Sequence, residues 1–329
     1  MRKLYFLLPG TTGKFACGGL FAELNALALA QQVCSAEVVT YRQREPKTPF
    51  LDDVLQAPDD VIFVLSWGFD VPKLAKRLKA HHTLYHAHSS GYGFRLPASV
   101  PIITVSRNTM GYWGQWAPHS LIYYLPNQIS DRFCNLEQPR DIDVLVQARK
   151  SSEYLLQQLV PALQEKCNVF VLDTFVEDLS QLFNRAKIYL YDSAEYWARE
   201  GVSEGFGLQP MEAAACGCQV FSSVNGGLSD YLDPGFNCHN IAGYSCEFDV
   251  QRILSALSAP KSLSLSEQVL AEYRTDNILR RLQTVLLEVN TLFDHQEKYA
   301  SNIQPLTSGR IVQLRSQKLW QKLRAKLGS

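Results

Sequence analysis

The fold is decided by one stretch of the chain, Ser203-Glu204-Gly205-Phe206-Gly207-Leu208-Gln209-Pro210-Met211-Glu212-Ala213-Ala214-Ala215-Cys216-Gly217. A β-rich run and a loop precede this stretch, Pro210 suits the first turn of a helix, and Gly217 suits its end. The N–H groups of Gly207, Leu208 and Gln209 have no partner inside such a helix, and the positive end of its dipole lies beside them. The stretch therefore predicts a strand–loop–helix unit of an α/β fold, with a diphosphate site at the helix N-terminus.

Four residues of this stretch indicate that the ligand also carries hydroxyl groups. Gly205 and Gly207 have no Cβ, so a ligand can approach the backbone closely there. Glu204 stands before the helix and Glu212 one turn inside it, on either side of the expected diphosphate. Carboxylate oxygens accept strong charge-assisted hydrogen bonds, so they suit the hydroxyls of a sugar.

The rest of the chain alternates strand-like and helix-like segments, which predicts parallel sheets covered by helices on both faces. The first 125 residues contain expected strands at Lys3–Leu8, Ala36–Thr40, Val61–Leu65, Thr83–His86, Ile102–Val105 and Leu121–Tyr124, and helices at Phe21–Val33 and Pro72–Ala80. The later expected strands are Asp143–Gln147, Val169–Leu172, Lys187–Tyr191 and Gln219–Ser222, with helices at Ser152–Glu165, Leu179–Asn184 and from Leu208. Two such series predict an α/β protein with two Rossmann-like domains that face each other across a cleft.

Pro126-Asn127 interrupts the alternation, and we place the domain boundary there. Residues 1–128 and 129–265 are expected to form the two domains, and residues 266–329 C-terminal helices. One long helix is predicted over 266–293, because apolar residues recur there at spacings of four and three. These residues are Ile278, Leu282, Val285, Val289 and Leu292.

The pair Glu204 and Glu212, separated by seven residues, together with the surrounding glycines resembles the signature of family 4 glycosyltransferases. These are retaining enzymes of the GT-B fold, which need no metal. Asn225–Asp230 resembles the Gly-Gly-x-x-Glu loop of that family, with Asp230 in place of Glu, and Tyr85–Gly91 resembles a strand end that carries an active-site His. The resemblance covers about residues 3–245 and is strongest over 200–232.

The resemblance implies a role for each matching residue. Glu204 would bind hydroxyls of the transferred sugar, Glu212 the ribose, and Arg149 the departing diphosphate. His88 would contact the sugar from the opposite domain. The implied catalytic set is His88, Arg149 and Glu204, and the implied donor-binding set is Gly18, Gly19, Lys150, Gly205, Phe206, Gly207, Leu208 and Glu212.

The implied reaction is transfer of a hexose from a nucleotide sugar to an acceptor (glycan, lipid or small molecule) with retention of configuration. No cofactor or metal is expected beyond the nucleotide-sugar donor. The departing phosphate would accept the proton of the acceptor, and catalysis would rest on stabilising the diphosphate. A nucleotide-sugar epimerase or hydrolase on the same fold is one alternative. A catalytically degenerate nucleotide-sugar-binding subunit is another.

Two departures from the family pattern bear on these alternatives. The family has a Lys about five residues after the Arg, whereas Tyr154 stands there in this chain. Either Lys150 substitutes from a shifted position or one phosphate clamp is missing. An unusually long loop is also expected between Asp192 and Glu204, where it would cap the acceptor side.

Charge and metal-ligand patterns exclude other classes of function. The formal net charge is zero, but residues 131–275 carry 11 basic and 20 acidic side chains, which argues against a nucleic-acid partner. The eight cysteines lack paired Cys-x2-Cys spacing, and Cys216 and Cys218 are expected in the core. His86 and His88 lie on one face of a strand, so chelation is sterically feasible, but a substrate-facing His is commoner and no metal is expected.

The end of the chain predicts a basic amphipathic helix. Residues 310–329 carry six basic and no acidic side chains, with Val312, Leu319, Trp320, Leu323 and Leu327 on one helical face. Such a helix is typical of a peripheral element on an anionic membrane surface. The alternative is a helix that docks on the protein with Trp320 in its core. Because no export signal was found, we expect a cytoplasmic protein, either free or on the inner face of a membrane.

Overall fold

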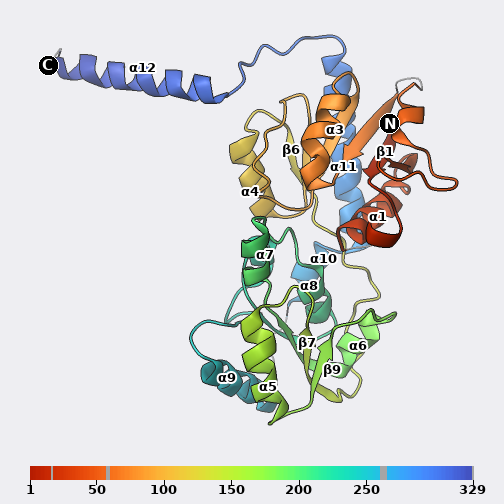
Figure 1. Cartoon of the computed structure of the whole chain (residues 1–329), viewed down its shortest axis with the longest axis vertical. Coiled ribbons are helices and arrows are strands. Elements are labelled where there is room, and N and C mark those ends of the chain that lie inside the picture. The colour runs from red at the N-terminus through yellow and green to blue at the C-terminus, as the bar shows by residue number, and fades with distance from the viewer. Residues whose placement is uncertain (16–17, 57–59, 260–264, 328–329) are drawn as a thin grey trace.

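A computed structural model of the chain describes residues 1–15, 18–56, 60–259 and 265–327. The chain folds into two α/β domains that lie end to end, with the first domain carrying both chain termini (Figure 1). Each domain has one sheet, and every strand pair in both sheets is parallel. The predicted fold class, two Rossmann-like domains, is confirmed.

The first sheet is buried on both faces, which explains why its strands are continuous apolar runs. Along β1, Leu4 and Phe6 lie in one core cluster, whereas Tyr5 and Leu7 lie in the cluster on the opposite face. The first of these faces is covered by α1 (Gly18–Ala30) and α11 (Thr275–Gln296), the second by α2 (Leu51–Val54), α3 (Val71–Arg77) and α4 (Arg107–Trp116). The strand order is β2 (Ala36–Thr40), β1 (Lys3–Leu8), β3 (Val61–Leu65), β4 (His82–Ala87), β5 (Ile102–Thr104), β6 (Ile122–Tyr124).

The second sheet is built in the same way. Its strand order is β11 (His239–Asn240), β10 (Gln219–Ser222), β9 (Ala186–Tyr191), β7 (Ile142–Gln147), β8 (Val169–Leu172). One face is covered by α6 (Leu179–Arg185), α8 (Leu208–Ala215) and α10 (Glu267–Ala271), the other by the π-helix η3 (Leu155–Leu159), α5 (Val160–Gln164) and α9 (Cys246–Ser258). The helix expected at Ser152–Glu165 is thus a π-turn that continues into α5.

The single long helix predicted over 266–293 is wrong, because the chain passes from one domain to the other within it. The helix is interrupted between α10 and α11 where Tyr273 packs into the core of the second domain. Arg274 is extended and donates hydrogen bonds to the carbonyl groups of Ile129, Ser130 and Phe133. Beyond this crossing, α11 covers the first sheet (Figure 1).

The apolar stripe of α11 is close to the expected one. Ile278, Leu282, Val285 and Val289 are buried as predicted, but the last position is filled by Phe293 rather than by Leu292, which is only partly buried. Since 3.6 residues make one turn, a strict four–three alternation drifts around a straight helix, and the next inward position falls one residue later.

The last helix, α12 (Ser308–Leu327), extends away from the first domain (Figure 1). Trp320 is 67% exposed, so the alternative in which this residue packs into a core is wrong. Val312, Leu319 and Leu323, on the same helical face, are also exposed. In the described part of the chain, no helix is both long and apolar enough to cross a lipid bilayer.

Truncation of α11 side chains tests its place in the core of the first domain. Leu286 is 1% exposed within that core, whereas its neighbour Leu287 is 54% exposed. We expect Leu286→Ala to lower the free energy of unfolding by about 2–5 kcal/mol, because it opens a cavity, and Leu287→Ala by less than about 1 kcal/mol. Urea unfolding of both variants measures the difference. Equal losses would show that α11 does not complete this core.

Candidate functional site

The two sheets point the carboxyl ends of their strands toward each other, and loops from both ends meet there. The loop after β4 carries Ser89 and Ser90, and the segment between β9 and α8 carries Ser203. The Ser89 hydroxyl donates to the Ser203 carbonyl oxygen at 2.6 Å, and the Ser203 N–H donates to the Ser90 carbonyl oxygen at 3.0 Å. The two domains therefore touch directly beside Glu204.

Gly205 permits the closest contact between the domains. A Cβ on this residue would lie 1.5 Å from the carbonyl oxygen of His88. Gly207 has a φ of +78°, and a Cβ there would meet the side chain of Leu228 at 2.3 Å. We expected these glycines to make room for a ligand. In this structure the space beside each is instead filled by the protein, and Phe206 between them is buried in the second core.

A second contact between the domains involves Asp230 at the end of the short helix η4 (Gly226–Asp230). Its carboxylate accepts hydrogen bonds from the N–H groups of Arg107 at 2.6 Å and Asn108 at 3.3 Å. These are the first N–H groups of α4 in the opposite domain, where a negative charge is favoured by the helix dipole. Asp230, which stands where the resembling family has a Glu, thus caps the N-terminus of α4 from the other domain.

The N-terminus of α8 has the features of the predicted anion site. The helix begins at Leu208, Pro210 lies in its first turn, and Gly217 follows its end with a φ of +84°. The N–H groups of Gly207, Leu208 and Gln209 donate no hydrogen bond to any residue that the structure describes. Unpaired helix N-terminal amides of this kind bind phosphate and other anions.

Glu204 is held in place from the second domain. It is 6% exposed, and its Oε2 atom accepts hydrogen bonds from the Tyr191 hydroxyl at 2.6 Å and the Trp197 Nε1–H at 2.7 Å. Its Oε1 atom has no hydrogen-bond partner among the described residues and is not among the fully buried unpartnered atoms. One carboxylate oxygen is therefore structural, and the other remains for a ligand.

The segment between Asp192 and Glu204 is not the open loop that the sequence predicts. Residues Ala194–Glu200 form the short helix α7, which lies between the two domains (Figure 1). Trp197 projects from it to Glu204, and the Lys150 ammonium lies 4.3 Å from the centroid of the Trp197 ring. Lys150 has a φ of +68° in the turn after β7, so this turn directs its side chain toward α7.

Arg149, the neighbour of Lys150, is exposed and forms no ion pair or hydrogen bond with a described residue. It follows β7 at the same sheet edge as the N-terminus of α8, because β7 and β9 are adjacent. A cation without a partner beside helix amides without partners favours an anionic ligand at this edge.

Glu212 is half-buried in α8, and its carboxyl group makes no hydrogen bond with any described residue. Burial raises the pKa of this carboxyl group to about 7, and the charge of Arg132 opposes the rise only in part. The carboxyl group is therefore poised to gain a hydrogen-bond partner from a ligand.

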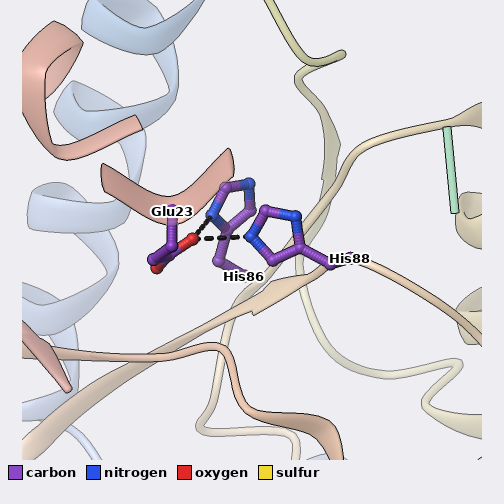
Figure 2. Close-up of side chains that lie close together, drawn as sticks. All are labelled: Glu23, His86 and His88. Carbon is purple, nitrogen blue, oxygen red and sulfur yellow. Dashed lines mark hydrogen bonds and ion pairs between the residues drawn. The ribbon is translucent and has the colours of Figure 1, made fainter. Parts of the chain in front are cut away.

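A cluster of three side chains in the first domain contains His88 (Figure 2). Glu23 Oε2 lies 2.7 Å from His86 Nδ1 and 2.6 Å from His88 Nε2. Glu23 is 1% exposed, and the two imidazoles outweigh its burial and lower its pKa to about 2. Sequence reasoning missed Glu23, although it is the one acidic residue in the apolar segment Gly18–Ala30.

The donor set of this cluster, one carboxylate and two imidazoles, could hold a metal ion. The observed spacings are those of hydrogen bonds, however. Two ligands at about 2.0 Å on a tetrahedral ion lie about 3.3 Å apart, farther than either nitrogen lies from the carboxylate oxygen. The arrangement is thus a hydrogen-bonded triad. Cys216 and Cys218 are buried, as the sequence predicts, in the second core.

Three further residues of the predicted set are Gly18, Gly19 and Leu208. Gly18 and Gly19 are the first two residues of α1, are exposed, and lie one turn before Glu23. Leu208 lines a narrow apolar pocket together with His86, at the junction of the domains. The structure thus brings residues of the predicted set together from both domains at this junction.

Comparisons of the structure place the chain in a fold class. It is similar to sucrose-phosphate synthase from Thermosynechococcus elongatus (14% identity, 88% of this chain and 100% of that chain covered, TM-score 0.61). It is also similar to HepE from Anabaena in complex with UDP and glucose (14%, 88% and 100%, TM-score 0.62) and to a glycosyltransferase from Rickettsia africae (13%, 88% and 98%, TM-score 0.61). The chain has the GT-B fold.

Part of the chain also matches a family model by sequence. Residues 136–268 match the model of glycosyl transferases group 1, which confirms a resemblance to glycosyltransferases over this segment, whereas the assignment to family 4 stays a prediction. The segment contains Arg149, Glu204 and Glu212 and the N-terminus of α8. No curated protein matches the chain by sequence.

The raised pKa of Glu212 predicts a pH dependence of stability. The folded-state pKa of about 7 lies above the ordinary value of 4.5, so the folded protein holds this proton more tightly than the unfolded chain. The resulting stabilisation is complete below about pH 4.5 and is lost as the pH rises through 7. We expect Glu212→Gln, which cannot titrate, to remove about 1–3 kcal/mol of the fall in stability between pH 5 and 8.

Urea unfolding at several pH values measures this effect, with Glu153→Gln as the control, because Glu153 is an exposed glutamate of the same domain. The same pH slope in the wild type and in Glu212→Gln would contradict a buried, protonated Glu212.

Proposed function

We propose that the protein is a retaining glycosyltransferase that moves a hexose from a nucleotide sugar to an acceptor. The observation that carries the proposal is the set of unpaired N–H groups at the N-terminus of α8. They lie between Glu204 and Glu212 in the sequence, within the segment that matches glycosyl transferases group 1. This arrangement offers donors for a diphosphate and carboxylates for hydroxyls on either side of it.

Each side chain of the site has a role in this proposal. Arg149 neutralises the diphosphate, which is consistent with its exposed position without an ion pair. The Lys150 side chain lies beside Trp197 of α7. We propose that it contacts the phosphates from there and replaces the Lys that the family has about five residues after the Arg. The Oε1 atom of Glu204 binds a sugar hydroxyl, and Glu212 binds the ribose.

The proposed route needs no nucleophile from the protein. The phosphate leaves on the face from which the acceptor enters, and a phosphate oxygen takes the acceptor proton, which retains the configuration. Arg149 and the α8 amides stabilise the charge that develops on the diphosphate. All of these groups come from the chain itself, so we propose a transfer that depends on no metal ion.

UDP is the nucleotide that we propose first. HepE of Anabaena was solved with UDP and glucose and with UDP-glucose, and the pneumococcal O-GlcNAc transferase GtfA with UDP and GlcNAc. The fold of this chain is shared with HepE over 88% of its length in the complex with UDP and glucose.

Thermal unfolding and turnover with UDP-glucose test the proposal. UDP at about 100 times its dissociation constant should stabilise the protein by about 2.7 kcal/mol, and GDP, ADP and dTDP should do less. We expect Arg149→Ala to lower turnover about 10- to 1,000-fold, because it removes a charge that stabilises the departing diphosphate. Arg185 lies directly before the amino end of β9, at the opposite end of that strand from the site. Arg185→Ala should therefore change turnover less than about twofold.

The products distinguish the alternatives. Binding of UDP without turnover for any acceptor favours a degenerate subunit, and free sugar or an isomerised donor without acceptor favours a hydrolase or an epimerase. Product of inverted configuration would contradict the retaining route.

We further propose that α12 binds an anionic membrane surface on its cytoplasmic side. The helix extends away from the first domain (Figure 1). Its apolar face carries the exposed side chains of Trp320 and Leu319. Basic residues flank this face, and residues 308–327 include no acidic side chain. The described cysteines are all unpaired, which is consistent with a reducing compartment.

Vesicle sedimentation tests this location. We expect binding to vesicles with about one-third phosphatidylglycerol, weaker binding to pure phosphatidylcholine, and a loss of about tenfold or more for Trp320→Ala, because the residue would lie at the lipid boundary. Tyr244→Ala is the matched control, since Tyr244 is an aromatic residue that is 91% exposed in the second domain. Equal binding of both variants would contradict insertion of α12.

A further inference from the structure

The Glu23 carboxylate fixes which nitrogen of each neighbouring imidazole carries a proton. At neutral pH this group is ionised, since its pKa is about 2, and an ionised carboxylate only accepts hydrogen bonds. His86 Nδ1 and His88 Nε2 both lie within 2.7 Å of the same oxygen. Each of these nitrogens must therefore carry a hydrogen atom.

The second nitrogen of His88 is then an acceptor. Burial and the neighbouring His86 lower the pKa of His88, although Glu23 opposes them, so the neutral ring predominates at pH 7. A neutral imidazole with its proton on Nε2 has a lone pair on Nδ1. Nδ1 has no partner among the described residues, and it is not one of the fully buried polar atoms without a partner. It is open to a hydroxyl donor.

The position of His88 places this acceptor beside the second domain. The carbonyl oxygen of His88 packs on Gly205, and the next residue, Ser89, is hydrogen-bonded to Ser203. Glu204 lies between those two contacts along the chain. A hydroxyl-bearing ligand held by Glu204 Oε1 would thus lie next to residue 205, against which the backbone of His88 packs from the opposite domain.

We propose that Glu23 is a positioning residue, which holds His88 as the tautomer whose Nδ1 accepts a hydrogen bond from a hydroxyl of the transferred sugar. This inference rests on the proposed function for the identity of the ligand. The tautomer itself rests on the geometry of the triad and on the ionised state of Glu23, and not on the identity of the ligand. Glu23 contacts neither donor nor acceptor and acts through His88.

The remaining oxygen of Glu23 explains why a glutamine cannot replace it. Oε1 is buried without a hydrogen-bond partner, so Oε2 alone receives both N–H groups. In Glu23→Gln, an amide oxygen at the Oε2 position could still accept both N–H groups, but the NH2 group would then lie buried at the Oε1 position without an acceptor. In the opposite orientation the NH2 group can donate to an imidazole that has moved its proton to the other nitrogen, and we expect His88 to do so.

Nitrogen NMR of protein with 15N-labelled histidine reads the tautomer directly. In the wild type without ligand, we expect the His88 Nδ1 signal of an unprotonated nitrogen and the Nε2 signal of a protonated one, assigned by its loss in His88→Gln. A His88 that carries its proton on Nδ1 in the wild type would overturn the inference, whether or not any variant folds.

Turnover of UDP-glucose tests the consequence. We expect Glu23→Gln to lower kcat about 10- to 100-fold, which corresponds to one misdirected buried hydrogen-bond partner. The affinity for UDP, which has no sugar, should change less than about twofold. Glu23→Asp keeps the charge and should recover part of kcat, while Glu37→Gln, at an exposed ion pair with Lys3, should leave both quantities unchanged.

The outcomes separate the two proposals. If the wild type turns over UDP-glucose and Glu23→Gln does so at the same rate, the positioning role is wrong and the proposed function stands. If the wild type shows the expected tautomer but no turnover or binding of any nucleotide sugar, the proposed function fails, and the sugar contact of His88 fails with it.

Discussion

The contact between the backbone of His88 and Gly205 is the constraint on which the site depends. The two sheets end toward each other, and their loops can approach this closely only because residue 205 has no Cβ. Ser89 and Ser90 then reach Ser203, and Asp230 reaches the N-terminus of α4. A larger residue at 205 would force the domains apart and would separate His88 from Glu204.

Three carboxyl groups at this junction differ in their surroundings. Glu23 is fully buried yet ionised, because two imidazoles face it. Glu204 is buried beside hydroxyl and indole donors, which occupy one of its oxygens. Glu212 has no such neighbours, and burial alone raises its pKa to about 7. The first two are therefore prepared by the protein, whereas the third depends on what binds.

The sequence predicts the parts of the fold whose physics is local. The strands are recognisable because both sheet faces are buried, and the start and end of α8 because Pro210 and Gly217 mark them. Helix α4 was missed, since Gly111 and Gly114 lower the helix propensity of its sequence and only Thr109 and Trp113 in it are buried. Its N-terminus is capped by Ser106 and by Asp230 of the other domain, and the second of these contacts cannot be seen in the local sequence.

The site was predictable to a similar degree. Glu204 and Glu212 stand out by their spacing, but the partners that hold Glu204 come from α7, a helix with no buried residue and hence no apolar pattern. Glu23 lies 63 residues before His86 and 65 before His88, so only the folded chain shows that they meet. The interruption between α10 and α11 likewise depends on the packing of Tyr273 in a distant core.

The position of α11 also governs the order in which the protein can mature during synthesis. The first sheet is made from residues 3–124, but one of its faces is covered only in part, by α1, until residues 275–296 have left the ribosome. The second domain, whose core ends near Tyr273, is complete earlier. The first domain is thus translated first and completed last. Part of its apolar surface stays exposed while the whole second domain is synthesised.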